Sequence, residues 1–158
     1  MDAAIERCVA GSLLEWSVTG DAVIMHRRLA RVLRERDQSR GQWVRTVAAA
    51  LNLLEPLLFP EREAWSRRED GARLGAQVEA LWDADAGTGT GDRDLALRQL
   101  RARSWAVRQL RASADLSRAI AAGIRTLADA ERVLGADHPQ TLTSRNNLER
   151  ARIEGHSD

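Results

Sequence analysis

The residues whose types and spacing could carry chemistry are few, and the clearest juxtaposition is Asp137-His138. It lies in the stretch RVLGADHPQTLTSRNNL, where an acid, a histidine and a proline closely follow a glycine. This pattern is typical either of a catalytic or metal-binding pair or of a boundary between two helices. Gly135 can end a helix, Asp137 or His138 can cap the next one, and Pro139 fits a first turn, where no backbone donor is needed. We interpret the stretch as a helix boundary.

Composition excludes several classes of site. All 24 basic residues are arginine, so the chain lacks the lysine of a phosphate-binding Walker loop and the lysine of Schiff-base catalysis. Cys8 is the single cysteine, and the three histidines form no cluster with metal-ligand spacing. No serine elbow, paired-carboxylate motif or Cys–His arrangement is recognisable. We expect a protein that is not an enzyme and that has no metal and no cofactor.

The charge and hydropathy patterns bear on partners and location. A formal net charge of +1 gives no broad basic field, so neither nucleic acid nor an anionic membrane is an expected partner. No stretch approaches the apolar length of a membrane helix, and the N-terminal MDAAIERCVAG does not resemble a secretion signal. We expect a cytoplasmic protein.

The clear strand signal is a β-hairpin near the N-terminus. SLLEWSV and AVIMH flank Gly20-Asp21, a two-residue turn that would place Val18 opposite Val23 and Trp16 opposite Met25. A hairpin of this size is too small to fold alone, so we expect its apolar side chains to pack on one of the two helices that follow. These side chains are Leu14, Trp16, Val23 and Met25.

The remainder of the chain has helical periodicity. A glycine-rich stretch predicts a flexible linker over 83–94. The predicted fold class is therefore mainly α, with antiparallel helical hairpins after a short N-terminal β-hairpin. The predicted helices are 27–36, 43–58 with a bend or an end at Pro56, 61–82, 94–110, 113–134 and 139–154.

The segment LADAERVLGADHPQTLTSRNNL, residues 127–148, resembles tetratricopeptide repeats of the kinesin-light-chain type. The turn, the cap and the pair Asn146-Asn147 occur together and in the same order as in that family. The resemblance implies that 95–158 forms one and a half tetratricopeptide-like repeats. Stacked repeats of this kind have a concave surface lined by the first helix of each repeat.

The N-terminal VIMHRRLARVLRER is similar to the end of the winged-helix domain in signal-transduction ATPases with numerous domains (STAND). In that class an NB-ARC nucleotide-binding module precedes tetratricopeptide repeats, and LLEPLLFP and WSRRE continue the order seen in actinobacterial members. The resemblance implies a partial winged helix at 1–40, a helical spacer at 41–82, the linker at 83–94 and the repeats at 95–158. It also implies that His26 senses a nucleotide, if another chain supplies the ATPase.

Together the resemblances imply a non-catalytic interaction or scaffold module that is a fragment of a STAND-type regulator. Asparagine side chains can bind a peptide backbone through a donor and an acceptor, and arginines can pair with acidic groups. Local pairing and a solvated surface are the alternatives for these residues. The peptide-binding candidates are Asn146, Asn147, Arg145 and Arg103.

The expected partner is a protein or peptide. An unpaired last helix that carries Leu142 and Leu148 also favours a homo-oligomer. The alternative function is that of a winged-helix DNA-binding transcriptional regulator fragment, which would need a recognition helix and a basic surface.

Overall fold

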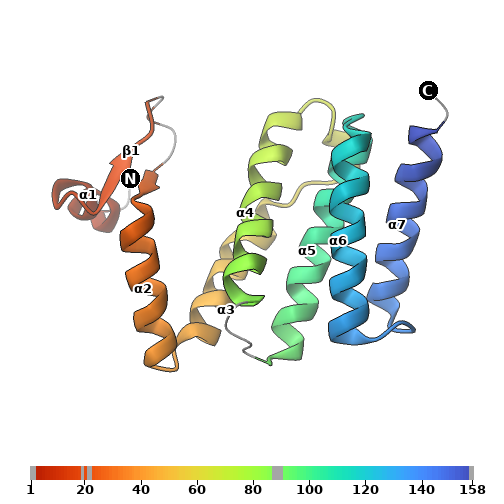
Figure 1. Cartoon of the computed structure of the whole chain (residues 1–158). Helices are drawn as coiled ribbons and strands as arrows, with labels where there is room; N and C mark the ends of the chain where they lie inside the picture. Colours follow the sequence, from red (N-terminus) through yellow and green to blue (C-terminus); the bar gives the residue numbers. More distant parts are fainter. Residues whose placement is uncertain (1–2, 19, 21–22, 87–90, 157–158) are drawn as a thin grey trace. The chain divides into compact units, whose positions relative to one another are not determined.

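The computed structural model describes residues 3–18, 20, 23–86 and 91–156 (Figure 1). Over these residues it contains seven α-helices and a two-stranded antiparallel sheet, which confirms the predicted mainly helical class with a short N-terminal β-hairpin. The chain divides into two compact units, Met1–Trp43 and Val44–Asp158. Each unit is described by itself.

The first unit contains two short helices and the hairpin. Helix α1 contacts strand β1, and no sequence signal predicted this helix. His26 caps the second helix, because its Nδ1 accepts a hydrogen bond from the backbone N–H of Arg28 at 3.3 Å. The elements are α1 (Ala3–Ala10), β1 (Leu14–Trp16), β2 (Val23–Met25) and α2 (Arg27–Ser39).

The register of the hairpin differs from the prediction. Trp16 pairs with Val23, so residues 17–22 connect the strands, where a two-residue turn was expected. The backbone N–H of Gly20 donates to the carbonyl of Ser17 at 2.9 Å, and this turn ends β1 early. Asp21, the other residue of the predicted turn, lies outside the described residues.

The hairpin side chains do not pack into a core with one of the two helices that follow, as was predicted. Trp16, Val23 and Met25 are 39%, 38% and 41% exposed, and Leu14 is half-buried. The strands are three residues long and present too few apolar side chains to cover a helix. Consistently, none of the residues of α2 is buried.

The second unit holds the helices expected from periodicity, with shifted ends. The first of them ends at Leu54, two residues before Pro56, and a 3₁₀ turn replaces its predicted last part. The predicted helix 61–82 begins as a second 3₁₀ turn. The elements are α3 (Trp43–Leu54), η1 (Glu55–Leu57), η2 (Glu61–Glu63), α4 (Arg68–Ala86), α5 (Arg93–Ala112), α6 (Leu116–Leu134) and α7 (Pro139–Gly155).

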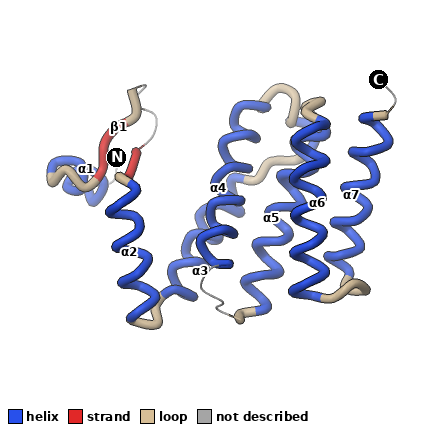
Figure 2. The backbone as a smooth tube through the Cα atoms, viewed as in Figure 1, coloured by secondary structure: helices blue, strands red, loops and turns tan. Residues whose placement is uncertain are grey.

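Helices α4 to α7 are antiparallel neighbours in chain order (Figure 1, Figure 2). Helix α7 also contacts α5. On the other side of α5, the guanidinium of Arg98 donates to Asn52 at 2.8 Å and to Glu55 at 2.7 Å, at the end of α3. Helix α5 thus contacts α4, α6 and α7, and Arg98 joins it to the end of α3. The predicted spacer and repeats pack in the same unit.

Helix α5 is the centre of the core, with most of its residues between Gln99 and Gln109 buried. The indole of Trp105 contacts Phe59 edge to face, with ring centroids 5.4 Å apart. Its Nε1 donates to the carbonyl of Phe59 at 2.7 Å. One aromatic side chain therefore fixes the connection between α3 and α4 on the central helix. A second cluster joins α4, α5 and α6 through Trp82, Leu100, Ala130 and Leu134.

The boundary between α6 and α7 confirms the interpretation of the stretch around Asp137-His138. Gly135 follows α6 with a φ of 96°, a backbone conformation that favours glycine. His138, and not Asp137, caps α7 by accepting the backbone N–H of Gln140 on its Nδ1 at 3.1 Å. Pro139 is the first helical residue.

The predicted linker is shorter than expected. Helix α4 continues to Ala86, and α5 begins at Arg93 with the side chain of Asp92 accepting the N–H groups of the first turn. Both ends of the predicted range 83–94 are therefore helical. Residues 87–90 lie outside the described residues.

Candidate protein-binding groove

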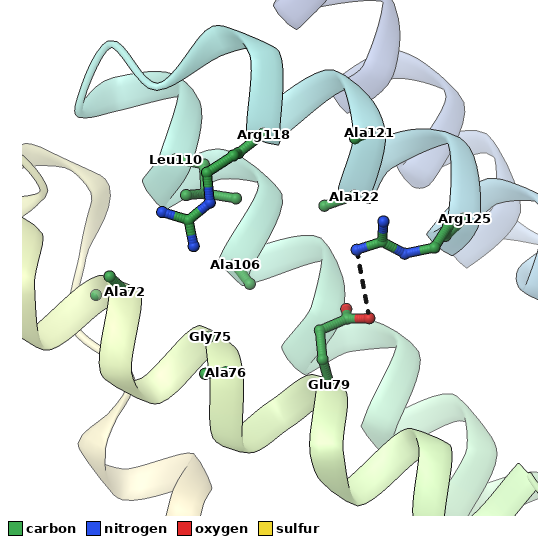
Figure 3. Close-up of a pocket in the computed structure, with 11 residues that line it drawn as sticks. Ala72, Gly75, Ala76, Glu79, Ala106, Leu110, Arg118, Ala121, Ala122 and Arg125 are labelled. Atoms are coloured by element: carbon green, nitrogen blue, oxygen red, sulfur yellow. Dashed lines mark ion pairs between the residues drawn. The ribbon is translucent and has the colours of Figure 1, made fainter.

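A groove of about 260 Å³ opens between α4 and α6, above α5 (Figure 3). Most residues of its α4 wall have little or no side chain and are spaced by about one helical turn, so the space between the helices stays open there. Ala106 and Leu110 of α5 form the floor. The α4 wall is Gly71, Ala72, Gly75, Ala76 and Glu79, and the α6 wall is Arg118, Ala121, Ala122 and Arg125.

Two arginines of α6 border this apolar floor. Arg118 and Arg125 are seven residues apart, about 10 Å along the helix, and both guanidinium groups lie over the groove (Figure 3). Arg125 reaches Glu79 of α4 at 3.9 Å, whereas Arg118 pairs at 3.1 Å with Asp115 of its own helix. Their side chains are 59% and 64% exposed. Both are therefore accessible to a ligand carboxylate.

The groove continues into a second hollow of about 400 Å³, which shares Glu79 and Arg125 with the first. Arg103 lies beneath it with 1% of its side chain exposed. Its guanidinium donates to Glu79 at 2.9 Å and to Asp129 at 2.7 Å, and it lies 4.8 Å from the ring centre of Trp82. Arg103 joins α4, α5 and α6, so it is not available to bind an acidic group of a ligand as predicted.

The carboxyl of Asp129 has a pKa below its ordinary value of 3.8. Burial raises the pKa, but hydrogen bonds and charge attraction from Arg103 and Arg132 together outweigh that effect. Because the folded-state pKa is the lower one, the unfolded chain takes up this proton first as the pH falls. The contribution of the Asp129 carboxylate to the free energy of unfolding is therefore complete above the unfolded-state pKa. It is lost as the pH drops through the folded-state pKa.

We expect an Asp129→Asn variant to lose less stability on acidification than the parent chain. The free energy of unfolding can be followed by urea denaturation between about pH 3 and pH 6, the range in which carboxylates titrate. Asp137→Asn, at an exposed turn acid, is the matched control and should follow the parent. An identical pH dependence for Asp129→Asn and the parent would contradict this assignment.

The other predicted peptide-binding residues lie together on α7, away from the groove. Asn146 is exposed, and Arg145 donates to Glu131 of α6 at 2.9 Å. Asn147 is only 8% exposed, and its Nδ2 has no hydrogen-bond partner. The structure therefore brings Arg145, Asn146 and Asn147 to one helix, while Arg103 is directed towards α4 and α6.

His26 lies in the first unit, at the N-terminus of α2, and its Nδ1 is used for capping. Among the described residues, no group of histidine, cysteine and acidic side chains could hold a metal ion. No described helix has both the length and the apolar character needed to cross a membrane.

Comparison with protein-family models, with curated proteins and with solved structures found no match to this chain. The resemblance to tetratricopeptide repeats and to STAND regulators therefore stays a prediction.

The groove can hold an apolar side chain and a carboxylate side by side. An apolar side chain of a ligand can contact Ala106 and Leu110, while a carboxylate pairs with Arg118 or Arg125 at the rim. Sequence analysis did not identify these residues. The available signal was the α6 spacing of Arg118, Ala121, Ala122 and Arg125, which puts two arginines and two alanines on one helix face.

Proposed function

We propose that the chain is a non-catalytic protein-interaction or scaffold module in which the α4–α6 groove receives a peptide segment of a partner. In this proposal it is part of a STAND-type regulator with tetratricopeptide-like repeats. Support for an interaction module comes from the antiparallel stacking of α4 to α7 and from the resemblance of residues 127–148. The groove lies between α4 and α6 and not on the first helix of each repeat, so it is supported by its own geometry. His26 would contact a nucleotide only in a complex with a separate ATPase chain.

The proposal rests on the combination of residues that line the groove. The groove combines an apolar floor with Arg118, which pairs with Asp115 at the start of its own helix. Arg118 lies opposite Ala72 and Gly75 of α4, which have little or no side chain. A partner carboxylate can form a charge-assisted hydrogen bond there without displacing a contact between helices. The ligand class is therefore a short peptide segment with an apolar residue next to an acidic one.

A selection from displayed random peptides tests the proposal. We expect the chain to enrich peptides in which Leu, Ile or Phe lies close to Asp or Glu. Ala121→Trp fills the groove and Arg118→Glu reverses its charge, so each should weaken binding of a recovered peptide at least tenfold, about 1.4 kcal/mol. Ala49→Trp, at an exposed alanine of α3, is the matched control and should bind as the parent does.

All variants should first show the far-ultraviolet circular dichroism and the unfolding midpoint of the parent. If no peptide is enriched, or if Ala121→Trp binds a recovered peptide as tightly as Ala49→Trp does, the groove is not the binding site.

A further inference from the structure

The outer face of α7 carries a stripe of exposed side chains, spaced so that they lie on one side of the helix. Leu142 and Ile153 are 43% and 66% exposed, the side chain of Glu149 is 54% exposed, and Asn146 is exposed. Apolar residues thus lie at both ends of the stripe, with an amide and a carboxylate between them. We call these four residues the α7 stripe.

The opposite face of α7 is already packed. Ser144 hydrogen-bonds Ser104 of α5 at 3.2 Å, and Leu148 fits against Gly123 of α6, where an added Cβ would lie 3.2 Å from Leu148 Cδ1. Leu148 is 2% exposed, so it is not available for self-association as predicted. Among the described residues, the large hydrophobic side chains that α7 exposes are Leu142 and Ile153, and both belong to the α7 stripe.

The α7 stripe is complementary to itself when a second copy lies antiparallel. A twofold axis passing between Asn147 and Leu148 brings Leu142 opposite Ile153 of the second copy, and Asn146 opposite Glu149. Apolar then meets apolar, and an amide donor meets a carboxylate acceptor. A parallel copy would place Glu149 beside Glu149, which is unfavourable.

The charged neighbours of the α7 stripe are partly neutralised within the chain. Arg145 pairs with Glu131 at 2.9 Å, and Arg152 pairs with Glu149 at 3.0 Å. Arg145 and Arg152 are therefore compensated, whereas Arg150, exposed beside Asn146, has no ion pair within the described part of the chain. Glu149 has two carboxylate oxygens, so it can accept from Asn146 of a second copy while it keeps Arg152.

We propose that α7 is a self-association surface, occupied by a second copy of this chain in antiparallel orientation. The contact is one helix wide, so it is smaller than a standard stable interface and the dimer is weak. This surface is separate from the α4–α6 groove, and it does not depend on peptide binding there.

Disulfide trapping tests the orientation. In a Cys8→Ser background, a mixture of Leu142→Cys and Ile153→Cys chains should form a disulfide-linked dimer under mild oxidation. Neither variant alone should form this dimer. In the antiparallel arrangement the two copies of one position are offset by eleven residues, about 16 Å along the helix axis. This offset is beyond the reach of a disulfide. Crosslinking of Leu142→Cys with itself, to the same extent as the mixture, would overturn the antiparallel arrangement.

Charge variants test the affinity by sedimentation equilibrium. Asn146→Lys gains an ion pair with Glu149 of the second copy and should lower the dimer dissociation constant. Asn146→Glu should raise it, so that the two differ at least tenfold. Within one helix, Arg150 four residues on favours a glutamate and Glu149 three residues on favours a lysine, so the local effects oppose each other and the change in the dimer dissociation constant reports on the second copy.

A parent chain that stays monomeric up to millimolar concentration, or equal dissociation constants for the two variants, would overturn the proposal. Ala121→Trp should dimerise as the parent does, so failure of the groove proposal is distinguishable from failure of this one.

Discussion

Replacing Trp105 with alanine is expected to lower the free energy of unfolding by about 3–5 kcal/mol, the range for large aromatic deletions in a core. The side chain is 6% exposed, and its indole packs edge to face on Phe59. The variant also removes the 2.7 Å hydrogen bond to the carbonyl of Phe59. Gln109 still donates to that carbonyl at 3.1 Å, so the carbonyl keeps one partner and most of the loss is in packing.

Urea denaturation followed by circular dichroism measures this effect, and Trp65 provides a matched control. Trp65 is 63% exposed, so Trp65→Ala should cost less than about 1 kcal/mol. Trp105→Phe should fall between the parent and Trp105→Ala, because it keeps a ring but loses the N–H donor. Equal losses for Trp65→Ala and Trp105→Ala would show that Trp105 is not the core contact described above.

Replacing Arg103 with alanine should be the second most damaging change. Removal of the guanidinium leaves Glu79 and Asp129 without their shared buried partner, and a broken buried ion pair costs about 3–5 kcal/mol. The carboxylates are 25% and 24% exposed, and Arg125 and Arg132 remain near them. We therefore expect a loss of about 3–4 kcal/mol, in the lower part of that range.

Arg101→Ala is the control, since Arg101 is exposed on the same helix and its removal should change stability by less than about 0.5 kcal/mol. Arg103→Lys should recover only part of the loss, because an ammonium group cannot bond two carboxylates with the planar geometry of a guanidinium. If Arg103→Lys is as stable as the parent, the planar guanidinium between Glu79 and Asp129 contributes nothing to the free energy of unfolding beyond its charge.

The features predicted correctly from the sequence are those set by residues close together in the chain. Gly135, His138 and Pro139 act within a few residues of each other, so the boundary between α6 and α7 could be read directly. The mainly helical class followed from periodicity. The hairpin register was predicted wrongly, because the pair Gly20-Asp21 indicated a two-residue turn, whereas Trp16 pairs with Val23.

The candidate site could not be predicted because its residues come together only in the tertiary structure. Arg103 and Arg118 both lie on amphipathic helices, yet one is buried between two carboxylates and the other lies over a groove. Nothing in the local sequence distinguishes them, because the partners of Arg103 are 24 and 26 residues away. The same holds for Leu142 and Leu148, whose burial depends on which face of α7 meets α6.

A nuclear magnetic resonance titration of the labelled chain with a selected acidic and apolar peptide tests the central claim most directly. Occupation of the groove should shift the methyl signals of Ala106, Leu110 and Ala122 first, and Ala121→Trp should abolish these shifts while Ala49→Trp preserves them. Shifts confined to the first unit or to the outer face of α7, with the groove methyl groups unchanged at saturation, would contradict the assignment of the α4–α6 groove as the protein-binding site.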